Sequence, residues 1–464
     1  MRNPPSFGKL AFVLTTSFLT ASVGCSAEAP PTHNNSSASS TADTYTYASP
    51  LPPITCDWYR AAGTPPDDGS TPSNTIRYGW IDLEAGYWAF ALDPRLPVGT
   101  TKFRINGHFP KARNFSLQLY AGNVTNLQTM TDYQIYPDAG GHSPYTGINT
   151  YDTSVQVGPN DTYTVHIVYG VAPSNPTPNT FYVDASRFTK TEYAVFLMRV
   201  YNPFAPVTVA DHGGYPLPAV VQETDGGDVS LADLNTPGRC NAYLDYRDTE
   251  RKTVAKVFDS INANPRKSDP IPANKYLKQP KFTIYETTDS SWLVNGDNRY
   301  IYAKLSQTKA DLVLMRARAP TFATQPGVGS DPQLRHWAVC ENAAISYETY
   351  SCIEDYQATI DQDSFFNIVL SWPGKKPDNA DKAHGFDWLT WGTTYTGVPI
   401  YRQQLSSPSF TQSAFSVPAG TEDPSTIMGD YWIQATYCSK TVFDNHTQMG
   451  ESPSEVFDAC KAGK

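Results

Sequence analysis

The sequence predicts a mainly β protein with two tandem antiparallel β-sandwich-like domains that arose by internal duplication. Three observations lead to this prediction. Short segments alternate apolar and polar residues and end at Pro, Gly, Asn or Asp, as strands do. A motif, D-Y-Q-x-x-x-D, occurs twice, at residues 132–138 and 355–361. The chain has 13% aromatic and 17% charged residues, which is typical of a globular protein and not of a disordered one.

The first 24 residues have the layout of a secretory signal peptide. Arg2 and Lys9 precede an uncharged, apolar stretch from Leu10 to Val23. This stretch is shorter than the roughly 20 residues that a membrane-spanning helix needs, so we expect an exported protein and not a transmembrane one. The segment that ends at Cys25 resembles a bacterial lipobox, with Ser22 where Leu is usual. The resemblance implies a lipid on Cys25; ordinary signal cleavage is the alternative.

The cysteine count fits an exported chain with one lipidated cysteine. Seven cysteines are present, and setting Cys25 aside leaves six, an even number that suits a disulfide framework. Six cysteines allow fifteen connectivities, and we expect one in which each of the three bridges stays within one copy of the repeat. These pairs are Cys56 with Cys240, Cys340 with Cys352, and Cys438 with Cys460.

The chain divides into five segments. The run that follows Cys25 is rich in Ser, Thr, Ala and Pro and has no apolar periodicity, so it is predicted to be a flexible tether. The expected boundaries are a signal peptide at 1–24, the tether at 25–55, a first β-domain at 56–240, a helical connector at 241–274 and a second β-domain at 275–464.

The duplication extends beyond the repeated motif. Arg113 precedes Asp132 by 19 positions, and Arg335 precedes Asp355 by 20, so the register is almost kept. Three further pairs of predicted strands match in order: 87–92 with 300–305, 103–110 with 312–320, and 163–168 with 366–370. We therefore expect the two domains to share one strand order.

Two helices are predicted. Within 248–262, one apolar stripe recurs at helical spacing on Val254, Val257, Phe258 and Ile261. A shorter helix should begin at Ser452, because Pro453 occupies its first position and Glu455 completes a capping box. This second helix would bring Cys460 within reach of Cys438.

The repeated aspartates are the first candidate site residues: Asp132 and Asp138 in one copy, Asp355 and Asp361 in the other. On an extended strand, residues six apart lie about 20 Å from one another, which is too far for one acid and base pair. We expect these aspartates to cap turns at strand ends. The alternative is a joint site in which carboxylates of both copies meet at the domain junction.

The matched arginines, Arg113 and Arg335, are expected to pair with those aspartates and not to hold a substrate.

Aromatic residues in loop-like sequence give a second candidate site. Trp388 and Trp391 lie among Gly, Asp and Thr residues, so their rings could stack on a sugar. The alternative for both is packing in the core, which is the usual role of Trp in β proteins.

Several functional classes find no support in the sequence. The formal charge is −10 and no cluster of Lys and Arg occurs, so no nucleic-acid partner is expected. No H-x-H, H-x-x-x-H or H-E-x-x-H spacing occurs, which leaves no metal or other cofactor predicted from local motifs. The G-x-S-x-G signature of serine hydrolases is also absent.

The segments 109–117 and 334–338 resemble parts of uncharacterised bacterial envelope proteins built from β-domains of unknown function. The resemblance agrees with the fold prediction and brings no activity with it. We expect a lipid-anchored protein at the membrane surface of the bacterial cell envelope that binds a glycan or another small surface ligand. The alternative is a secreted, glycosidase-like hydrolase with its active site where the two β-domains meet.

Overall fold

Strands dominate the structure, as the alternating pattern predicts. The computed structural model describes residues 56–62, 79–121, 125–152, 158–189, 193–205, 207, 212–231, 279–285, 294–325, 327, 331–344, 348–392 and 394–463. The expected signal peptide, tether and connecting helix lie outside these residues, as do Cys25 and Cys240. The predicted bridge between Cys56 and Cys240 therefore also lies outside the described part of the chain.

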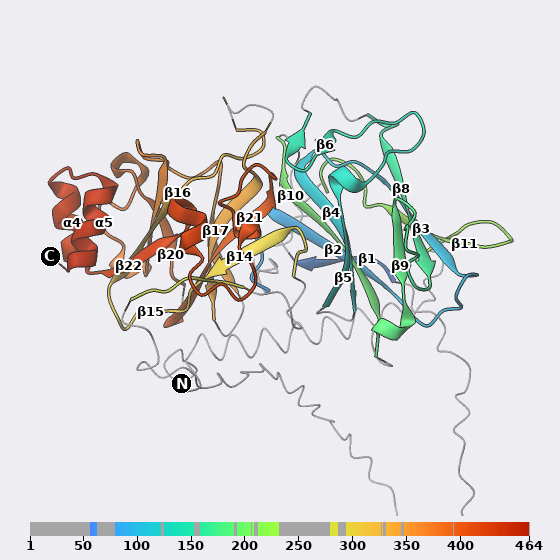
Figure 1. Ribbon diagram of the computed structural model, residues 1–464, viewed down its shortest axis with the longest axis horizontal. Coiled ribbons are helices and arrows are strands. Elements are labelled where there is room, and N and C mark those ends of the chain that lie inside the picture. Colours follow the sequence, from blue (N-terminus) through green and yellow to red (C-terminus); the bar gives the residue numbers. More distant parts are fainter. Residues whose placement is uncertain are drawn as a thin grey trace, which may run out of the picture. The chain divides into compact units, whose positions relative to one another are not determined.

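The first domain has two five-stranded sheets (Figure 1, blue to green). One sheet has the order β1 (Cys56–Ala62), β2 (Ala85–Leu92), β10 (Ala194–Pro203), β4 (Ala112–Ala121), β5 (Thr125–Thr131). The other has the order β12 (Val229–Ser230), β11 (Ala219–Glu223), β3 (Lys102–His108), β8 (Thr162–Tyr169), β9 (Thr180–Val183). A small hairpin, β6 (Tyr145–Gly147) and β7 (Thr150–Tyr151), and the 3₁₀ turns η2 (Asp132–Gln134) and η3 (Ala185–Arg187) complete this domain.

The second domain repeats the plan (Figure 1, yellow to red). Its first sheet has the order β13 (Thr283–Ile284), β14 (Asn298–Tyr302), β21 (Thr396–Ser406), β17 (Leu334–Ala343), β18 (Thr349–Glu354), and β15 (Leu305–Ser306) also pairs with β21. Its second sheet has the order β20 (Asp387–Thr390), β19 (Phe365–Ser371), β16 (Leu312–Arg318), β22 (Gln434–Cys438). The 3₁₀ turns are η5 (Pro373–Lys375), η6 (Lys382–His384), η7 (Ala414–Ser416) and η8 (Gly429–Tyr431).

The two domains share one topology, which confirms the predicted duplication. The order β1-β2-β10-β4-β5 matches β13-β14-β21-β17-β18, and β11-β3-β8-β9 matches β22-β16-β19-β20. In both domains the last pair of the second sheet is parallel and the other pairs of the two large sheets are antiparallel. A backbone detail is repeated as well: Asn202 and Leu405 have φ of 48° and 47°, and their N–H groups donate to the carbonyls of Glu84 and Asp297, respectively.

Each domain has its own apolar core between its two sheets. In the first domain, the rings of Phe115 and Tyr163 stack with their centroids 5.5 Å apart. In the second domain, Trp337 and Phe366 stack in the equivalent strands at 5.1 Å. Burial of one such aromatic side chain stabilises the fold by about 1.5–3 kcal/mol. Inward-facing residues of β4 and β17 therefore hold the two sheets of each sandwich together.

The D-Y-Q motif forms a turn directly after a strand in both copies. Residues Asp132–Gln134 make the 3₁₀ turn η2 directly after β5, and the side chain of Gln134 accepts the backbone N–H of Thr131 at 3.0 Å. The second copy repeats this contact, because Gln357 accepts the N–H of Glu354 at 3.2 Å. The glutamine of the motif thus satisfies a donor at the end of each strand.

The described residues contain three α-helices: α3 (Ser425–Met428), α4 (Lys440–Gln448) and α5 (Pro453–Ala462). The structure confirms the predicted C-terminal helix, and Ser452 and Glu455 form its capping box. Helix α4 was not predicted, although Ser439 caps it by accepting the N–H of Val442. None of the described helices combines the length and the apolar character needed to cross a bilayer.

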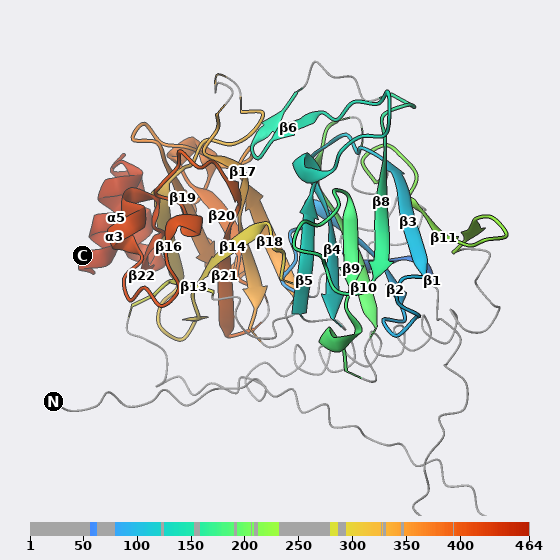
Figure 2. The same ribbon diagram turned by 45° about the vertical axis from the view of Figure 1, so that its right-hand side comes forward.

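Two of the expected disulfides are present. Cys340 and Cys352 lie opposite each other on β17 and β18, so their bridge joins neighbouring strands. Cys438 at the end of β22 is bonded to Cys460 in α5, and this helix packs beside β22 (Figure 2). The second bridge therefore holds the C-terminal helix on the edge of its sheet.

Candidate functional site

The matched arginines and aspartates pair across the two domains. The Nη1 atom of Arg113 lies 2.5 and 2.6 Å from the two carboxylate oxygens of Asp355. In the reciprocal pair, Nη1 of Arg335 lies 3.2 and 3.0 Å from the oxygens of Asp132. The side chains of the second pair are both 0% exposed. The sequence did not predict which arginine pairs with which aspartate. In the structure, each arginine pairs with the aspartate of the other domain.

Each aspartate also caps the turn of its own domain. The carboxylate of Asp132 accepts the N–H groups of Phe115 and Tyr133 at 2.9 and 2.6 Å. Asp355 accepts the N–H groups of Trp337 and Tyr356 at 3.1 and 2.7 Å. These hydrogen bonds lie within one domain, so they orient each carboxylate independently of the other domain. The oxygen atoms of each carboxylate therefore both cap the turn of their own domain and bind an arginine of the other domain.

Two equivalent loops extend the junction, and each contacts the other domain. In the loop before β2, Trp80 donates from Nε1 to the carbonyl of Ala343 at 2.9 Å. The carbonyl of Ile81 accepts from Thr349 Oγ1 at 3.0 Å and from Arg402 Nη2 at 3.1 Å. These bonds place the loop of the first domain against β17, β18 and β21 of the second.

The loop before β14 makes the reciprocal contacts. The carbonyl of Val294 accepts from the Tyr120 hydroxyl at 2.9 Å and from Asn126 Nδ2 at 3.4 Å. Asn295 donates from Nδ2 to the Tyr201 hydroxyl at 3.1 Å. Since Asn126 and Thr349 occupy equivalent positions of β5 and β18, the junction has an approximate twofold relation between its halves.

One half of this junction holds a charged cluster, which we call the His336 cluster: Asp82, His336 and Glu354. The Nε2 atom of His336 lies 3.3 Å from Asp82 Oδ2 and 3.2 Å from Glu354 Oε2. Its other ring nitrogen, Nδ1, lies 3.2 Å from Asp355 Oδ2. The three residues of the cluster are at most 1% exposed.

Burial and neighbouring charges shift the pKa values of the His336 cluster. Burial opposes the charged imidazolium, but the carboxylates of Asp355, Asp82 and Glu354 hold the pKa of His336 well above 6.5. Burial also disfavours the ionised form of Asp82, yet the hydrogen bond and charge of His336 lower its pKa to about 2. Burial, with the charge of Asp82, raises the pKa of Glu354 to about 8.

The other half of the junction is neutral at the equivalent positions. Asn114 stands in place of His336, Thr131 in place of Glu354, and Asn295 in place of Asp82. Asn114 donates to Asp132 at 3.2 Å, and the Thr131 hydroxyl donates to Asp297. The cluster was not predicted, although an alignment of the two copies residue by residue would have shown three charged residues facing three neutral ones.

The remaining aspartates of the repeated motif make local contacts. Asp138 accepts from the Thr162 hydroxyl at 2.7 Å. Asp361 accepts the N–H of Phe365 at 2.8 Å and the side-chain amide of Asn367 at 2.9 Å. Both residues therefore stabilise turns beside β8 and β19, as the turn-capping prediction describes.

The two candidate tryptophans of the second domain differ in exposure. Trp391 is 1% exposed and belongs to the apolar core, so a role as a surface platform for this residue is wrong. Trp388 is half-buried, donates from Nε1 to Ser371 Oγ at 3.0 Å and has the Lys376 ammonium 4.8 Å from its ring centroid. The surface of Trp388 is therefore partly covered by a charged side chain.

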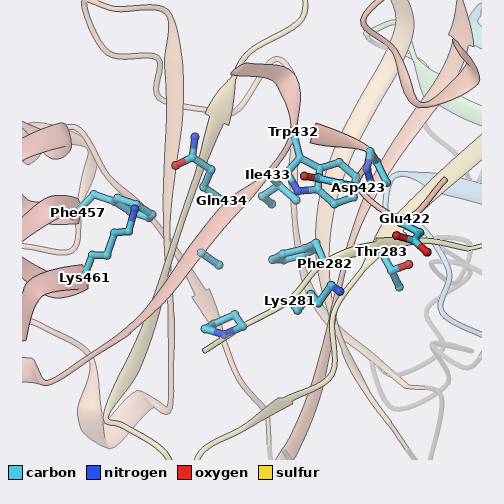
Figure 3. Close-up of a pocket in the computed structure, with 13 residues that line it drawn as sticks. Lys281, Phe282, Thr283, Glu422, Asp423, Trp432, Ile433, Gln434, Phe457 and Lys461 are labelled. Atoms are coloured by element: carbon cyan, nitrogen blue, oxygen red, sulfur yellow. The ribbon is translucent and has the colours of Figure 1, made fainter. Parts of the chain in front are cut away.

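A pocket of about 510 Å³ lies in the second domain, between the start of β13, the segment that leads into β22, and α5. We call it the Trp432 pocket. Figure 3 shows Trp432 and Phe282 on one side, close to Glu422 and Asp423, and Phe457 and Lys461 on the opposite side. The other lining residues are Pro280, Lys281, Thr283, Pro424, Ile433, Gln434 and Ala435.

The Trp432 pocket combines aromatic rings with polar and charged groups. The ring of Trp432 is partly exposed, while that of Phe282 is only 5% exposed and belongs to the core. Glu422, Asp423 and Gln434 are exposed at its rim. Its residues come from three distant parts of the chain, which is why no local motif revealed it.

Comparisons with known proteins add no argument on function. No family model and no curated protein matches the sequence. Among solved structures, an uncharacterized protein from Burkholderia cenocepacia has a TM-score of 0.43 and 12% identity, covering 72% of this chain and 76% of that one. The B domain of a biofilm-associated protein has a TM-score of 0.20 and 11% identity, covering 76% and 74%. These values are too low to support a shared function.

Proposed function

We propose that the protein is exported to the cell envelope, is anchored there by a lipid on Cys25, and binds carbohydrate in the Trp432 pocket. The observation that carries the binding proposal is the partly exposed Trp432 ring beside exposed carboxylate and amide groups. Ligand pockets typically combine apolar surface with a few polar groups that orient the ligand. A sugar ring matches this pattern because it presents C–H groups on its face and hydroxyl groups at its edge.

Two features support the export proposal. The bridges Cys340–Cys352 and Cys438–Cys460 are of the kind that persists in oxidising compartments outside the cytosol. The signal-like first 24 residues and the Ser- and Thr-rich segment behind Cys25 agree with delivery to a membrane surface and a flexible attachment to it.

The hydrolase alternative has weaker support from the structure. It places carboxylates of both domains in one reaction site at the junction. Asp82, Glu354 and Asp355 do meet there, but all three are buried, and Asp82 and Asp355 are engaged with His336 and Arg113. A glycosidase needs its two carboxyl groups on either side of a bound sugar, with access for water. We therefore place ligand binding in the Trp432 pocket and not at the junction.

The test is a glycan-array screen of the mature chain, followed by calorimetric titration of the best glycan. We expect Trp432→Ala to weaken binding at least tenfold, because it removes the ring on which the sugar would stack. Trp388→Ala is the matched control: it removes another half-buried Trp of the same domain, outside the pocket, and should leave the affinity unchanged. Equal losses in both variants, or no binding to any glycan, would refute the assignment. Release of chromophore from aryl glycosides, measured in parallel, would instead favour the hydrolase.

A further inference from the structure

The His336 cluster has the atoms and spacing of a metal site. Zinc in proteins is bound by His nitrogen and Asp or Glu oxygen at about 2.0–2.2 Å, so tetrahedral ligand atoms lie roughly 3.3–3.6 Å apart. The Nε2 atom of His336 is 3.3 Å from Asp82 Oδ2 and 3.2 Å from Glu354 Oε2. All three ligand atoms lie within 4.8 Å of one another.

A second observation points to a bound cation. Glu354 is 0% exposed, and among the described residues neither of its carboxyl oxygens makes a hydrogen bond of acceptable geometry. Buried polar groups are normally satisfied, so an unsatisfied carboxyl calls for a further ligand. The Nε2 atom of His336 carries at most one proton, and this proton must serve both Asp82 and Glu354. A cation between the three atoms would satisfy them all.

The surroundings of His336 resemble the support that metal-binding histidines receive. A metal-ligating histidine typically uses its second nitrogen to donate to a carboxylate, which fixes the ring. Nδ1 of His336 lies 3.2 Å from Asp355 Oδ2 and 3.1 Å from the side-chain amide of Asn202, and Asp355 is in turn held by Arg113 at 2.5 Å. Since Arg113 balances the charge of Asp355, a divalent cation would match the remaining carboxylates of Asp82 and Glu354.

The duplication supplies an internal comparison. The equivalent half of the junction uses Asn295, Asn114 and Thr131, whose amide and hydroxyl groups hydrogen-bond to their neighbours. Uncharged side chains at these three positions are therefore compatible with this fold and its packing. The other half of the junction has an ionisable side chain at each of the three positions instead.

We propose that Asp82, His336 and Glu354 bind one divalent transition-metal ion of the zinc class at the junction of the two domains. Asp82 belongs to the first domain, whereas His336 and Glu354 belong to the second. The ion therefore joins the domains in addition to the crossed Arg and Asp pairs. No metal was predicted from the sequence because these ligands come from distant segments, which local spacing rules do not detect.

The test uses the full mature chain without an affinity tag and without reductant. Reductant is excluded because the sulfur atoms of Cys340 and Cys352 lie within 4.8 Å of a Glu354 oxygen and would offer competing thiolates. The chain is treated with a chelator, dialysed, and titrated with Zn²⁺ alone. Plasma mass spectrometry should give one zinc per chain. The Tm should rise by roughly 3 °C at a hundredfold excess of Zn²⁺ over Kd.

The variant is the triple change Asp82→Asn, His336→Asn and Glu354→Thr, which copies the neutral half of the junction. It should fold and lose at least nine-tenths of the bound zinc. His384→Asn is the control, because His384 is an exposed histidine paired with Asp381 at 2.7 Å and should not affect zinc content. If the triple variant does not fold, Co²⁺ bound to the unaltered chain reports on the ligands through its visible absorption. A folded, unaltered chain with less than a tenth of a zinc and no Tm shift would overturn the proposal, as would full zinc binding by the triple variant.

Discussion

Replacing Arg335 with methionine tests the reasoning about the crossed ion pairs most directly. Arg335 is 0% exposed and donates from Nε and Nη2 to the carbonyl of Ile148 at 2.9 and 2.6 Å and from Nη2 to that of Gly147 at 2.7 Å. Its Nη1 atom serves Asp132. Arg335→Met retains much of the apolar side-chain volume but removes every one of these donors.

The expected loss of stability follows from the burial of Asp132. Removing one partner of a buried ion pair destabilises a protein by about 3–5 kcal/mol, because the other charge is left uncompensated. The partly buried carbonyls of Gly147 and Ile148 also lose their donor, so we expect the upper part of this range. The double variant Arg335→Met with Asp132→Asn removes both charges of this pair and leaves neither partner uncompensated. It should recover at least about 2 kcal/mol relative to the sum of the two single changes.

The assay is urea unfolding followed by tryptophan fluorescence and far-UV circular dichroism at pH 7. Arg318→Met is the matched control, because Arg318 pairs with Asp430 at 3.1 Å on the surface, with side-chain exposures of 38% and 59%. An exposed pair of this kind contributes about 0–1 kcal/mol. If Arg335→Met costs no more than Arg318→Met, or if the double variant is strictly additive, the pairs do not stabilise the fold as argued.

Two further predictions concern the second domain. Glu341 is buried without a hydrogen-bond partner among the described residues, and burial raises its pKa well above 4.5. Because its folded pKa is the higher one, stability should fall as pH rises above 4.5. Glu341→Leu, which introduces the residue found at the equivalent position, Leu119, should remove this fall and should stabilise the protein more at pH 7 than at pH 4.5. If the urea midpoint changes by the same amount between pH 4.5 and pH 7 in the unaltered chain and in Glu341→Leu, this prediction is wrong. Replacing Cys438 and Cys460 together with serine opens a 22-residue loop and should cost about 3 kcal/mol in the same assay, and an unchanged midpoint would show that the bridge is dispensable.

The sequence predicted the fold well because its signals are local or repeated. Period-two alternation marked β4 around Phe115 and Leu117, and the second copy offered an independent check of the same strand. The capping residues Ser452 and Glu455 marked the start of α5. Alternation does not separate a strand from the turn that follows it, so it did not predict the 3₁₀ turn at residues 132–134. Their 3₁₀ turn depends on a contact from Gln134 back to Thr131.

The candidate sites were less predictable because they are assembled across the chain. Arg113 could have met the aspartate of its own copy or that of the other, and only the packing of the two domains selects Asp355. The Trp432 pocket joins residues near 282, 423, 434 and 457, none of which forms a motif with its neighbours. The ligands of the His336 cluster are separated by more than 250 positions between Asp82 and His336.

The reciprocal junction makes this chain equivalent to a homodimer held within one polypeptide. In an isologous dimer each contact appears twice, once in either direction, and here Arg113 to Asp355 and Arg335 to Asp132 are such a pair. Either half expressed alone would present a self-complementary face with an unpaired guanidinium and an unpaired carboxylate. The separated domains should therefore associate, either as a heterodimer of the two or as homodimers of each. In the intact chain the covalent link ensures that each first domain is paired with one second domain.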